Sequence, residues 1–368
     1  MRVALITDEP RVTGIGKYAH NLSGELRQIG VDADLYFVKW RSHEVDAQLE
    51  AGRLVRPTPF SLPSTSLEAV IAHWRRESLF PRDYDVYHAV QQFLIPLLPS
   101  RGASIATIHD LRPFVLSGEY PFLLRRALRR ALRSASQLDL VITDSQSTSS
   151  DVARLTAIAK DKVVVIPLGH GPEFRPGKRV RNELGIPDDA TVLLNVGTED
   201  SSKNIPFLLQ VASSLQRRLP NLRLVRVGKR KDSTGALIDS LGLGGRVQYA
   251  SNITDEQLAM YYNSADLLLH PSLYEGFGLP PVEAMASGCP VVCSDMSSLP
   301  EVVGDAGLVL PLDASRWVDE IERLLRNSDQ IERYRALGLE RARSFTWASC
   351  AEKTARGYRE VLAQGDMR

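Results

Sequence analysis

Two glutamates on either side of a glycine loop form the stretch of the sequence best suited to chemistry. Glu275 and Glu283 flank Gly276 and Gly278, and good helix formers run from Leu279 to Ser287. Free amide N–H groups at the start of a helix and the positive end of its dipole favour phosphate oxygens. Carboxylates accept hydrogen bonds from hydroxyl groups. This combination predicts a ligand that carries both phosphates and hydroxyls.

The residues before the loop predict a buried strand, because the run from Ala265 to Ser272 is almost wholly apolar. Strand, glycine turn and helix together form an anion-binding arrangement, and glycines let ligand atoms approach the backbone closely. The same spacing is compatible with a plain strand-to-helix turn whose two glutamates are solvated. Taken alone, the loop leaves both interpretations open.

A second glycine turn follows the predicted strand from Val192 to Val196 and precedes a predicted helix from Ile205 to Arg217. The residues of this turn that could meet a ligand are Gly197, Thr198, Ser202 and Lys203. A lysine at a strand end beside a glycine suits a diphosphate, although most lysines are solvated surface charges.

Histidine at a strand end is the third candidate. The stretch from Ile105 to Asp110, IATIHD, predicts an apolar strand with His109 and Asp110 at its carboxyl end. Ligands of parallel α/β sheets bind at that edge, so the imidazole is a candidate binding group. The alternative is a histidine that only closes the strand by hydrogen bonding.

Gly14 and Gly16 satisfy the G-x-G-x-x-A pattern of dinucleotide-binding proteins, but their context does not support NAD binding. Several residues separate Gly14 from the first predicted strand, and the acidic residue at the expected distance, Asp34, begins the second strand instead of ending it. We expect a flexible glycine loop that borders the ligand site.

The elements that must position these residues alternate between short apolar runs and helical stretches, which is typical of parallel sheets covered by helices on both faces. The predicted strands of a first series are Val3–Thr7, Ala33–Val38, Val86–Ala89, Ser104–His109, Leu138–Thr143 and Val163–Pro167. Those of a second series are Val192–Val196, Leu222–Val227, Val247–Ala250, Ala265–His270, Pro290–Ser294 and Leu308–Pro311. Helices are predicted for Lys17–Gln28 and Ser147–Ala159, among others.

The predicted fold is therefore α/β, with two doubly wound, Rossmann-like domains facing a cleft. The stretch from Pro167 to Asp189 is dense in proline, glycine and charge, which favours an interdomain linker. We expect an N-terminal, acceptor-side domain over residues 1–172 and a C-terminal, donor-binding domain over 173–345. Residues 346–368 are expected to form a helix that packs back toward the N-terminal domain.

Bulk properties exclude several classes of function. The formal net charge is +1, so no global field favours nucleic acid. Three cysteines without paired spacing indicate reduced thiols in a cytoplasmic chain. The first apolar run of the sequence is too short for a signal peptide, and no apolar run is long enough to cross a membrane.

No metal site is predicted. The two D-x-D triplets, Asp32 to Asp34 and Asp83 to Asp85, stand at predicted strand starts and so away from the ligand edge, and no cluster of histidine or cysteine supplies ligands.

An arginine-rich helix is predicted for Phe122 to Ser134. Its apolar stripe is Leu124, Leu128 and Leu132, and its arginines are Arg125, Arg126, Arg129, Arg130 and Arg133. A solvated surface helix packed on the sheet is one interpretation. Peripheral contact with an anionic membrane is the other.

The segment from Pro271 to Asp295, PSLYEGFGLPPVEAMASGCPVVCSD, resembles the signature of retaining glycosyltransferase family 4, in which two glutamates are separated by seven residues. The similarity extends over nearly the whole chain and is strongest from Asn195 to Gly307. It implies the two-domain architecture called GT-B and a transferase that uses a nucleotide-diphosphate sugar, without metal or other cofactor.

The resemblance also implies roles for the candidate residues. Glu275 would contact the transferred sugar, Glu283 the ribose hydroxyls and Lys203 the diphosphate. His109 would contact the donor sugar, with its neighbour Asp110 holding the ring. The glycine loop would face sugar and diphosphate through the backbone amides of Gly276, Phe277, Gly278 and Leu279, and the segment with Gly14 and Gly16 would cover donor and acceptor.

The sequence departs from the family at Ser202, where many relatives carry arginine in an Arg-Lys-Asn run. The missing guanidinium removes bidentate recognition of a phosphate. Arg11, Lys229 or Arg230 is expected to compensate, or the serine hydroxyl to donate in its place.

The substrate follows from the resemblance alone. The pattern is most similar to mannosyltransferases that build surface polysaccharides, which implies GDP-mannose as the donor, UDP-glucose as the next candidate, and a glycan or lipid-linked acceptor. Two alternatives stay open: a sugar-nucleotide epimerase or phosphorylase of the same architecture, and a catalytically weak, nucleotide-sugar-binding partner subunit, the latter motivated by Ser202.

Overall fold

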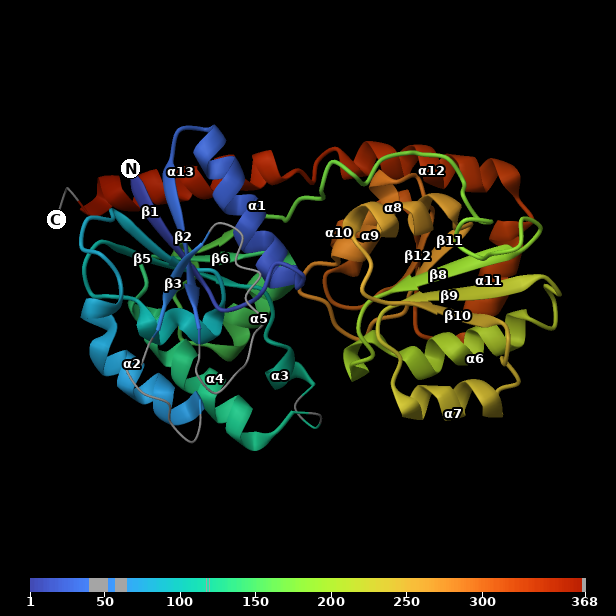
Figure 1. Ribbon diagram of the computed structural model, residues 1–368, viewed down its shortest axis with the longest axis horizontal. Coiled ribbons are helices and arrows are strands. Elements are labelled where there is room, and N and C mark those ends of the chain that lie inside the picture. Colours follow the sequence, from blue (N-terminus) through green and yellow to red (C-terminus); the bar gives the residue numbers. More distant parts are fainter. Residues whose placement is uncertain (40–51, 57–64, 117, 119, 366–368) are drawn as a thin grey trace. The chain divides into compact units, whose positions relative to one another are not determined.

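The computed structural model describes residues 1–39, 52–56, 65–116, 118 and 120–365, and the chain divides into two compact units (Figure 1). Unit 1 comprises Met1–Leu168 and Trp347–Arg368, and unit 2 comprises Gly169–Thr346. The divisions fall close to, but not at, the boundaries expected after residues 172 and 345. The last three residues of the expected terminal segment, 366–368, lie outside the described residues.

Unit 1 contains a seven-stranded parallel sheet in the order β3-β2-β1-β4-β5-β6-β7. The strands are β1 (Arg2–Thr7), β2 (Asp32–Val38), β3 (Arg53–Val55), β4 (Val86–Ala89), β5 (Ala103–Ile108), β6 (Leu140–Thr143) and β7 (Val163–Val165). Because all pairs are parallel, the residues that follow β1, β4, β5 and β6 meet at one edge of the sheet.

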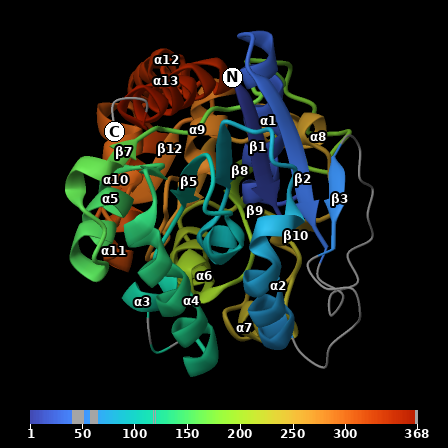
Figure 2. The same cartoon turned by 90° about the vertical axis from the view of Figure 1, so that its left-hand side faces the viewer.

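The sheet of unit 1 is covered on both faces. Its helices are α1 (Gly14–Gln28), α2 (Thr65–Leu79), α3 (Arg112–Val115), α4 (Phe122–Ser134), α5 (Gln146–Leu155) and α13 (Trp347–Gly365), with 3-10 turns η1 (Gln92–Leu97), η3 (Ala135–Gln137) and η4 (Lys160–Lys162). Helices α1 and α13 pack against each other. Helices α2 and α4 lie together on the opposite side of the sheet in both views (Figures 1 and 2).

Unit 2 contains a six-stranded parallel sheet in the order β10-β9-β8-β11-β12-β13. The strands are β8 (Thr191–Val196), β9 (Leu222–Val227), β10 (Val247–Ala250), β11 (Leu267–His270), β12 (Val291–Ser294) and β13 (Leu308–Leu310). Strands β8 and β11, which lead into the two candidate turns, are direct neighbours. The topology therefore brings those turns to the same edge.

Helices also cover both faces of the second sheet. They are α6 (Ile205–Leu215), α7 (Asp232–Ser240), α8 (Asp255–Ser264), α9 (Leu279–Ala286), α10 (Leu299–Val303), α11 (Ala314–Leu325) and α12 (Ser328–Ala342), with 3-10 turns η5 (Ser201–Lys203) and η6 (Gly304–Ala306). Helix α6 packs on α11 on one face, and α9 packs on α12 on the other (Figure 1). The core beneath α6 and α11 contains Leu208 and Trp317, both without exposed surface.

The two parallel sheets confirm the predicted α/β fold, and the predicted strands coincide with the observed ones to within about two residues at their ends. The strand β3 and the helix α2 were not predicted. Their segment of sequence also contains residues 40–51 and 57–64, which lie outside the described residues.

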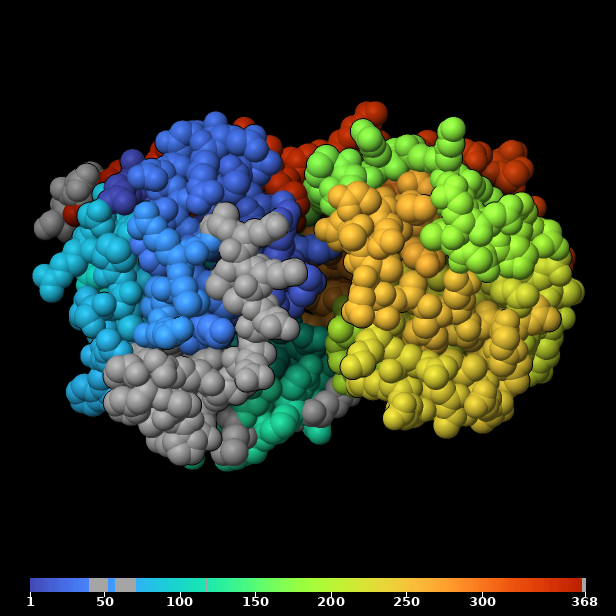
Figure 3. Space-filling model, in the orientation of Figure 1, coloured from blue at the N-terminus to red at the C-terminus, as the bar shows by residue number. Residues whose placement is uncertain are grey.

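The expected linker from Pro167 to Asp189 is, from Gly169 onward, an ordered part of unit 2, where it runs over the surface in green (Figures 1 and 3). Arg181 explains the order. It is 6% exposed, and its guanidinium donates to the carbonyls of Ser264, Asp188 and Ala190 and to Asp266. Proline, glycine and charge thus indicated irregular structure correctly, but the buried arginine fixes the segment to the domain.

The expected glycine loop at Gly14 and Gly16 is instead the first turn of α1. Thr13 caps the helix by accepting a hydrogen bond from the amide of Gly16. A Cβ on Gly16 would lie 1.9 Å from the carbonyl oxygen of Pro10, so no other residue fits at this position without moving the backbone. Close backbone packing, and not flexibility, accounts for this glycine.

Candidate active site

Glu275 lies between β11 and α9, where three side chains donate to one of its carboxylate oxygens. Lys203 Nζ is 2.6 Å from Oε1, His270 Nε2 is 2.8 Å from it, and Ser272 Oγ is 2.7 Å from it. Lys203 comes from η5 after β8, whereas the other two residues come from the end of β11. The neighbouring parallel strands thus bring a lysine and a glutamate together at the edge predicted to bind ligand.

The surroundings hold Glu275 in its ionised form. Burial alone would raise the pKa of its carboxyl, but the charge of Lys203 and the hydrogen bond from His270 outweigh burial and hold the pKa well below its usual range. Burial lowers the pKa of His270, which is 1% exposed, so the imidazole is neutral and donates through Nε2. The pair of Lys203 and Glu275 is therefore a partly exposed ion pair, with 16% and 11% of the side chains accessible, supported by a neutral histidine.

The backbone of the glycine loop is fixed from the segment after β12. Ser298 donates to the carbonyl oxygens of Glu275 and Phe277, at 3.0 and 2.7 Å, and Ser297 also donates to Glu275. Gly278 has a φ of 112°, a conformation that favours glycine, and directly precedes α9. The Phe277 side chain is buried and packs edge-on against Phe345, so only its backbone is suited to meet a ligand.

The first turn of α9 offers fewer amides than the sequence suggested. Pro280 and Pro281 follow Leu279 and carry no N–H, and the amide of Val282 bonds the carbonyl of Gly278. An anion at the start of this helix is therefore restricted to the amides of the loop itself, from Gly276 to Leu279.

Glu283 lies inside α9 and is 6% exposed. Tyr262 of α8 donates its hydroxyl to Glu283 Oε2 at 2.9 Å. Tyr262 is fully buried, and burial followed by the nearby Glu283 raises the pKa of its hydroxyl well above the ordinary value. The tyrosine therefore stays protonated and orients the glutamate.

Beneath Gly197 lies a buried arginine that sequence reasoning missed. Arg226 of β9 has no exposed surface and donates to Asn195 and to the carbonyl oxygen of Gly197, the latter at 3.1 Å. Its guanidinium also lies 3.7 Å from Glu199. Its position within an apolar strand gave no sign of this role. Arg226 supports the backbone of the glycine turn from below.

The Ser202 hydroxyl does not point toward a ligand. Ser202 has no exposed surface and donates to Asp200, and the Thr198 hydroxyl donates to the same carboxylate at 2.5 Å. The expectation that this serine replaces the missing arginine by donating to a phosphate is wrong for this arrangement, because its single proton is already engaged. Lys203 is the cation that this turn supplies.

In unit 1, His109 follows β5 and hydrogen-bonds through both ring nitrogens. Nδ1 is 2.6 Å from Asp144 Oδ2, and Nε2 is 2.8 Å from the carbonyl oxygen of Val90. Burial alone would lower the pKa of His109, but the charge and hydrogen bond of Asp144, together with the Val90 carbonyl, raise it. Both acceptors are oxygens, so the geometry favours the imidazolium form.

The expectation that Asp110 holds the ring of His109 is wrong. Asp110 accepts from the backbone amide of Arg112 at 3.1 Å and lies near its guanidinium. Asp144 orients the ring because it follows β6, the strand next to β5 in the sheet. A partner on the neighbouring strand cannot be recognised from spacing along the chain.

The candidate residues therefore form two groups, one in each unit. Unit 2 brings together Lys203, Glu275 and the loop from Gly276 to Leu279, with Glu283 in the helix that follows. Unit 1 holds Gly14, Gly16, His109 and Asp110. The D-x-D triplets lie at the amino ends of β2 and β4, where Asp32 and Asp83 pair with Arg2 of β1.

Among the described residues, no group of three or more histidine, cysteine or acidic side chains is arranged to hold a metal ion. Within the same residues, no helix is long and apolar enough to cross a membrane. All three cysteines are buried thiols.

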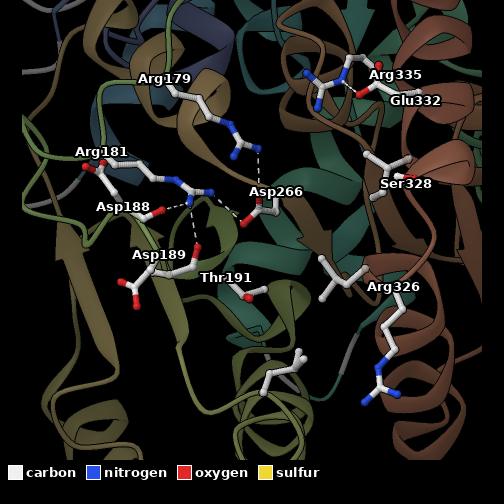
Figure 4. Close-up of a pocket in the computed structure, with 14 residues that line it drawn as sticks. Arg179, Arg181, Asp188, Asp189, Thr191, Asp266, Arg326, Ser328, Glu332 and Arg335 are labelled. Atoms are coloured by element: carbon white, nitrogen blue, oxygen red, sulfur yellow. Dashed lines mark hydrogen bonds and ion pairs between the residues drawn. The ribbon is translucent and has the colours of Figure 1, made fainter.

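A separate pocket of about 430 Å³ opens at the other end of the second sheet (Figure 4). Thr191 and Asp266, which border the amino ends of β8 and β11, help to line it. Asp266 is paired there, since it bonds both Arg179 and Arg181. The pocket is thus distinct from the candidate active site.

Sequence comparisons agree with this architecture. Residues 12–174 match the family described as Glycosyltransferase Family 4, and residues 178–341 match Glycosyl transferases group 1. The chain is 30% identical to an MMP alpha-(1->4)-mannosyltransferase from Mycolicibacterium hassiacum, with 99% of each chain covered. It is 32% identical to the O-antigen chain mannosyltransferase B of Escherichia coli over 78% of each chain.

Solved structures share the fold. A sucrose-phosphate synthase from Thermosynechococcus elongatus superposes with a TM-score of 0.82 at 23% identity, covering 99% of both chains. WaaG, a glycosyltransferase of lipopolysaccharide biosynthesis, superposes with a TM-score of 0.76 at 20% identity, covering 96% of this chain and 98% of WaaG. The two parallel-sheet units of this chain, its two family matches and a relative matched over 99% of its length agree with one another. This chain therefore belongs to the GT-B glycosyltransferases, with a Family 4 N-terminal half and a group 1 C-terminal half.

Proposed function

We propose that this glycosyltransferase moves a hexose from a nucleotide-diphosphate sugar to a hydroxyl of a glycan or lipid-linked acceptor, with retention of the anomeric configuration. GDP-mannose is the favoured donor, because two relatives, one matched over 99% and one over 78% of each chain, are described as mannosyltransferases. UDP-glucose is the next candidate, since a structural neighbour, Anabaena HepE, was solved with UDP-glucose.

The observation that carries the proposal is the ion pair of Lys203 and Glu275 at the edge of the second sheet. An ammonium group has three N–H donors, and the glutamate uses one of them. The remaining donors suit a diphosphate, whose negative charge grows as the bond to the sugar breaks. Lys203 then stabilises the leaving group more strongly in the transition state than in the ground state.

The loop and helix after Glu275 complete the donor site. The backbone amides of Gly276, Phe277, Gly278 and Leu279 are assigned to sugar and phosphate oxygens, and Gly197 and Thr198 to the opposite side of the diphosphate. Glu283 is assigned to the ribose hydroxyls. Its carboxylate is oriented by Tyr262, which favours a defined hydrogen-bond geometry toward a diol.

His109 is assigned to the donor sugar, which its Nε2 would meet in place of the Val90 carbonyl while Asp144 keeps Nδ1. The charge that Asp144 favours on its ring suits an oxygen-rich ligand whose leaving group is anionic. Protein cations and loop amides neutralise the diphosphate in this scheme, so transfer requires no divalent metal.

Peripheral membrane contact is assigned to α4. Among the residues of α4 whose burial is described, Leu128, Ala131 and Leu132 are buried, whereas Leu124, expected on the apolar stripe, is 37% exposed. Phe122 is 64% exposed. The helix contains no acidic residue, and Arg126, Arg129, Arg130 and Arg133 are exposed. Exposed apolar groups beside exposed arginines suit an anionic membrane surface, which a lipid-linked acceptor would occupy.

A panel of GDP, UDP, GDP-mannose and UDP-glucose tests the proposal by thermal shift, followed by release of nucleoside diphosphate in the presence of glycan acceptors. Ligand at about 100 times its dissociation constant stabilises the folded protein by roughly 2.7 kcal/mol. We expect stabilisation by the guanosine ligands, and an α-linked product from an α-linked donor by NMR. Absence of a shift with every nucleotide would overturn the proposal, and an inverted product would overturn retention.

A further inference from the structure

One oxygen of Glu275 is crowded with donors, and the other is not. Lys203, His270 and Ser272 all contact Oε1, within 2.6 to 2.8 Å. Within the described residues, no side chain or backbone group donates to Oε2. The carboxylate is therefore fixed through one oxygen and presents the other.

The two ring nitrogens of His270 differ in their partners, and packing does not explain the difference. The residue is 1% exposed, and its Nδ1 is buried with no hydrogen-bond partner among the described residues. A buried nitrogen without a partner costs free energy, and an apolar side chain at the end of β11 would avoid that cost. The contact that a leucine could not make is the one from Nε2 to Glu275.

Ser272 is positioned for the same purpose. It is 1% exposed, and its backbone carbonyl accepts from the Ser294 hydroxyl at 2.6 Å, which ties it to the end of β12. Its own hydroxyl has a single proton. That proton has a charged acceptor in Glu275, so the bond to the carboxylate is favoured over the longer contact of 3.2 Å to His270.

We propose that His270 and Ser272 are positioning residues that hold Oε1 of Glu275, so that Oε2 faces the hydroxyl groups of the bound sugar. Lys203 shares this oxygen and is also assigned to the diphosphate through its remaining N–H donors. The histidine and the serine hold the carboxylate independently of that second contact. This inference deepens the proposed function, on whose assignment of Glu275 it rests.

The charged groups around Glu275 come from two further elements. Lys203 contacts it from η5, and Arg226 of β9 acts on His270 by repelling a positive charge on the ring. In addition to burial, both cations lower the pKa of His270 and so favour the neutral histidine, and Lys203 also favours the ionised glutamate. The neutral ring donates from Nε2 without adding charge to a site that must later release an anionic diphosphate.

Activity variants test the positioning role. His270→Leu removes the donor, His270→Gln retains one near the position of Nε2, and Ser272→Ala removes the hydroxyl. With GDP-mannose as donor, we expect His270→Leu to lower kcat about tenfold or more while the Kd for GDP changes less than about twofold. His270→Gln should recover most of that loss, and Ser272→Ala should lose about threefold to tenfold. Equal losses in the leucine and glutamine variants, or an unchanged kcat in both, would overturn the proposal.

A stability measurement without substrate separates this proposal from the proposed function. His270→Leu, Glu275→Ala and the double variant are compared by thermal unfolding. Because the histidine acts on the glutamate, the fall in Tm caused by His270→Leu should be at least halved when Glu275→Ala is also present. Additive losses would overturn the proposed clamp even if transfer from GDP-mannose is found. Coupled losses would support the clamp even if another nucleotide sugar is the donor.

His88→Gln is the matched control. His88 is a fully buried histidine of β4 in unit 1, where it bonds Tyr358 and Thr107. Its replacement should lower Tm equally whether Glu275 is intact or carries the Glu275→Ala substitution. If the effect of His88→Gln on Tm depended on Glu275 as strongly as that of His270→Leu does, the coupling would not be specific to His270, and the proposal would be wrong.

Discussion

Asp144 accepts a hydrogen bond from Nδ1 of His109 at 2.6 Å, although the two residues follow different strands of the first sheet. The second nitrogen of the ring meets the Val90 carbonyl at 2.8 Å. Neither acceptor can donate while Asp144 is ionised, so this arrangement favours a ring that carries both protons. Burial raises the pKa of the Asp144 carboxyl as well, but the two oxygen acceptors around the ring favour the imidazolium, and Asp144 sets the orientation of the ring.

Asp144→Asn should therefore destabilise the protein in a pH-dependent way. A raised pKa of His109 in the folded state contributes stability that is fully present below the ordinary histidine pKa and lost as pH rises through the folded value. We expect a loss of about 1.5–3 kcal/mol at pH 6, typical of a hydrogen bond to a charged group, that shrinks toward pH 9. Urea unfolding of the wild-type protein and the Asp144→Asn variant at several pH values measures this difference in the free energy of unfolding. A loss that grows with pH would contradict the assigned charge.

Lys203→Ala should lower kcat/KM by at least about tenfold, or roughly 1.4 kcal/mol, because a charge-assisted contact with the leaving group disappears. Steady-state kinetics with GDP-mannose provide the measurement. Lys160→Ala, which alters an exposed lysine of η4 in unit 1, is the control and should be neutral. Unchanged kinetics in the Lys203 variant would remove the basis for the phosphate site.

Glu283→Ala and Glu275→Ala should differ in kind. The first should weaken GDP binding by about tenfold or more, since it removes the acceptor assigned to the ribose hydroxyls, while the second should mainly lower kcat. Tyr262→Phe should produce a milder form of the Glu283 effect, because it removes only the orienting hydroxyl. Calorimetric titration of GDP and turnover rates distinguish the three variants. The division of roles is wrong if both glutamate variants lose the same affinity for GDP.

Transfer should persist in EDTA. Lys203 and the amides of the glycine loop are assigned the neutralising role that a divalent ion plays in other sugar transfer sites, so removing free metal should change kcat less than about twofold. The rate is measured with EDTA and after adding back magnesium or manganese. Restoration of a lost rate by either ion would show that a metal takes part.

Phe122→Ser combined with Leu124→Ser should reduce sedimentation with vesicles that contain anionic phosphatidylglycerol, because both side chains are exposed on α4. Each lost apolar side chain removes on the order of 1.5–3 kcal/mol of burial when it inserts fully. Val164→Ser, which alters an exposed residue of β7 in the same unit, is the control and should leave sedimentation unchanged. Equal binding of wild-type and variant proteins, or binding to neutral vesicles alone, would contradict membrane contact through α4.

The sequence predicted both sheets because their strands are short, apolar and separated by helices of ordinary length. It also indicated Lys203 and Glu275 as candidates in turns that follow strands, where the structure brings them together, and Glu283 as a candidate in the helix that follows. His270 could have been found from its position at the end of a strand, a signal similar to that of His109, which directly follows one. Asp144 and Arg226 could not be found in this way, because strand order across the sheet brings them to their partners.

Local composition was misleading in two places. Gly14 and Gly16 look like a mobile loop, but Gly16 is required by contact with the Pro10 carbonyl inside the first turn of a helix. The stretch around Arg181 has the composition of a linker, yet its guanidinium is buried among four acceptors. Both errors arise because a tertiary contact decides the conformation.

The helix α13 completes unit 1 although it lies at the end of the chain. Its Tyr358 is fully buried and hydrogen-bonds His88 of β4, and its Cys350 and Ala351 are also buried. Unit 2 is one continuous segment, whereas unit 1 is built from two segments, and the second of them, from Trp347 onward, follows unit 2 along the chain. A chain cut before residue 347 should therefore retain every residue of unit 2 but lack the part of the unit 1 core that Cys350, Ala351 and Tyr358 supply.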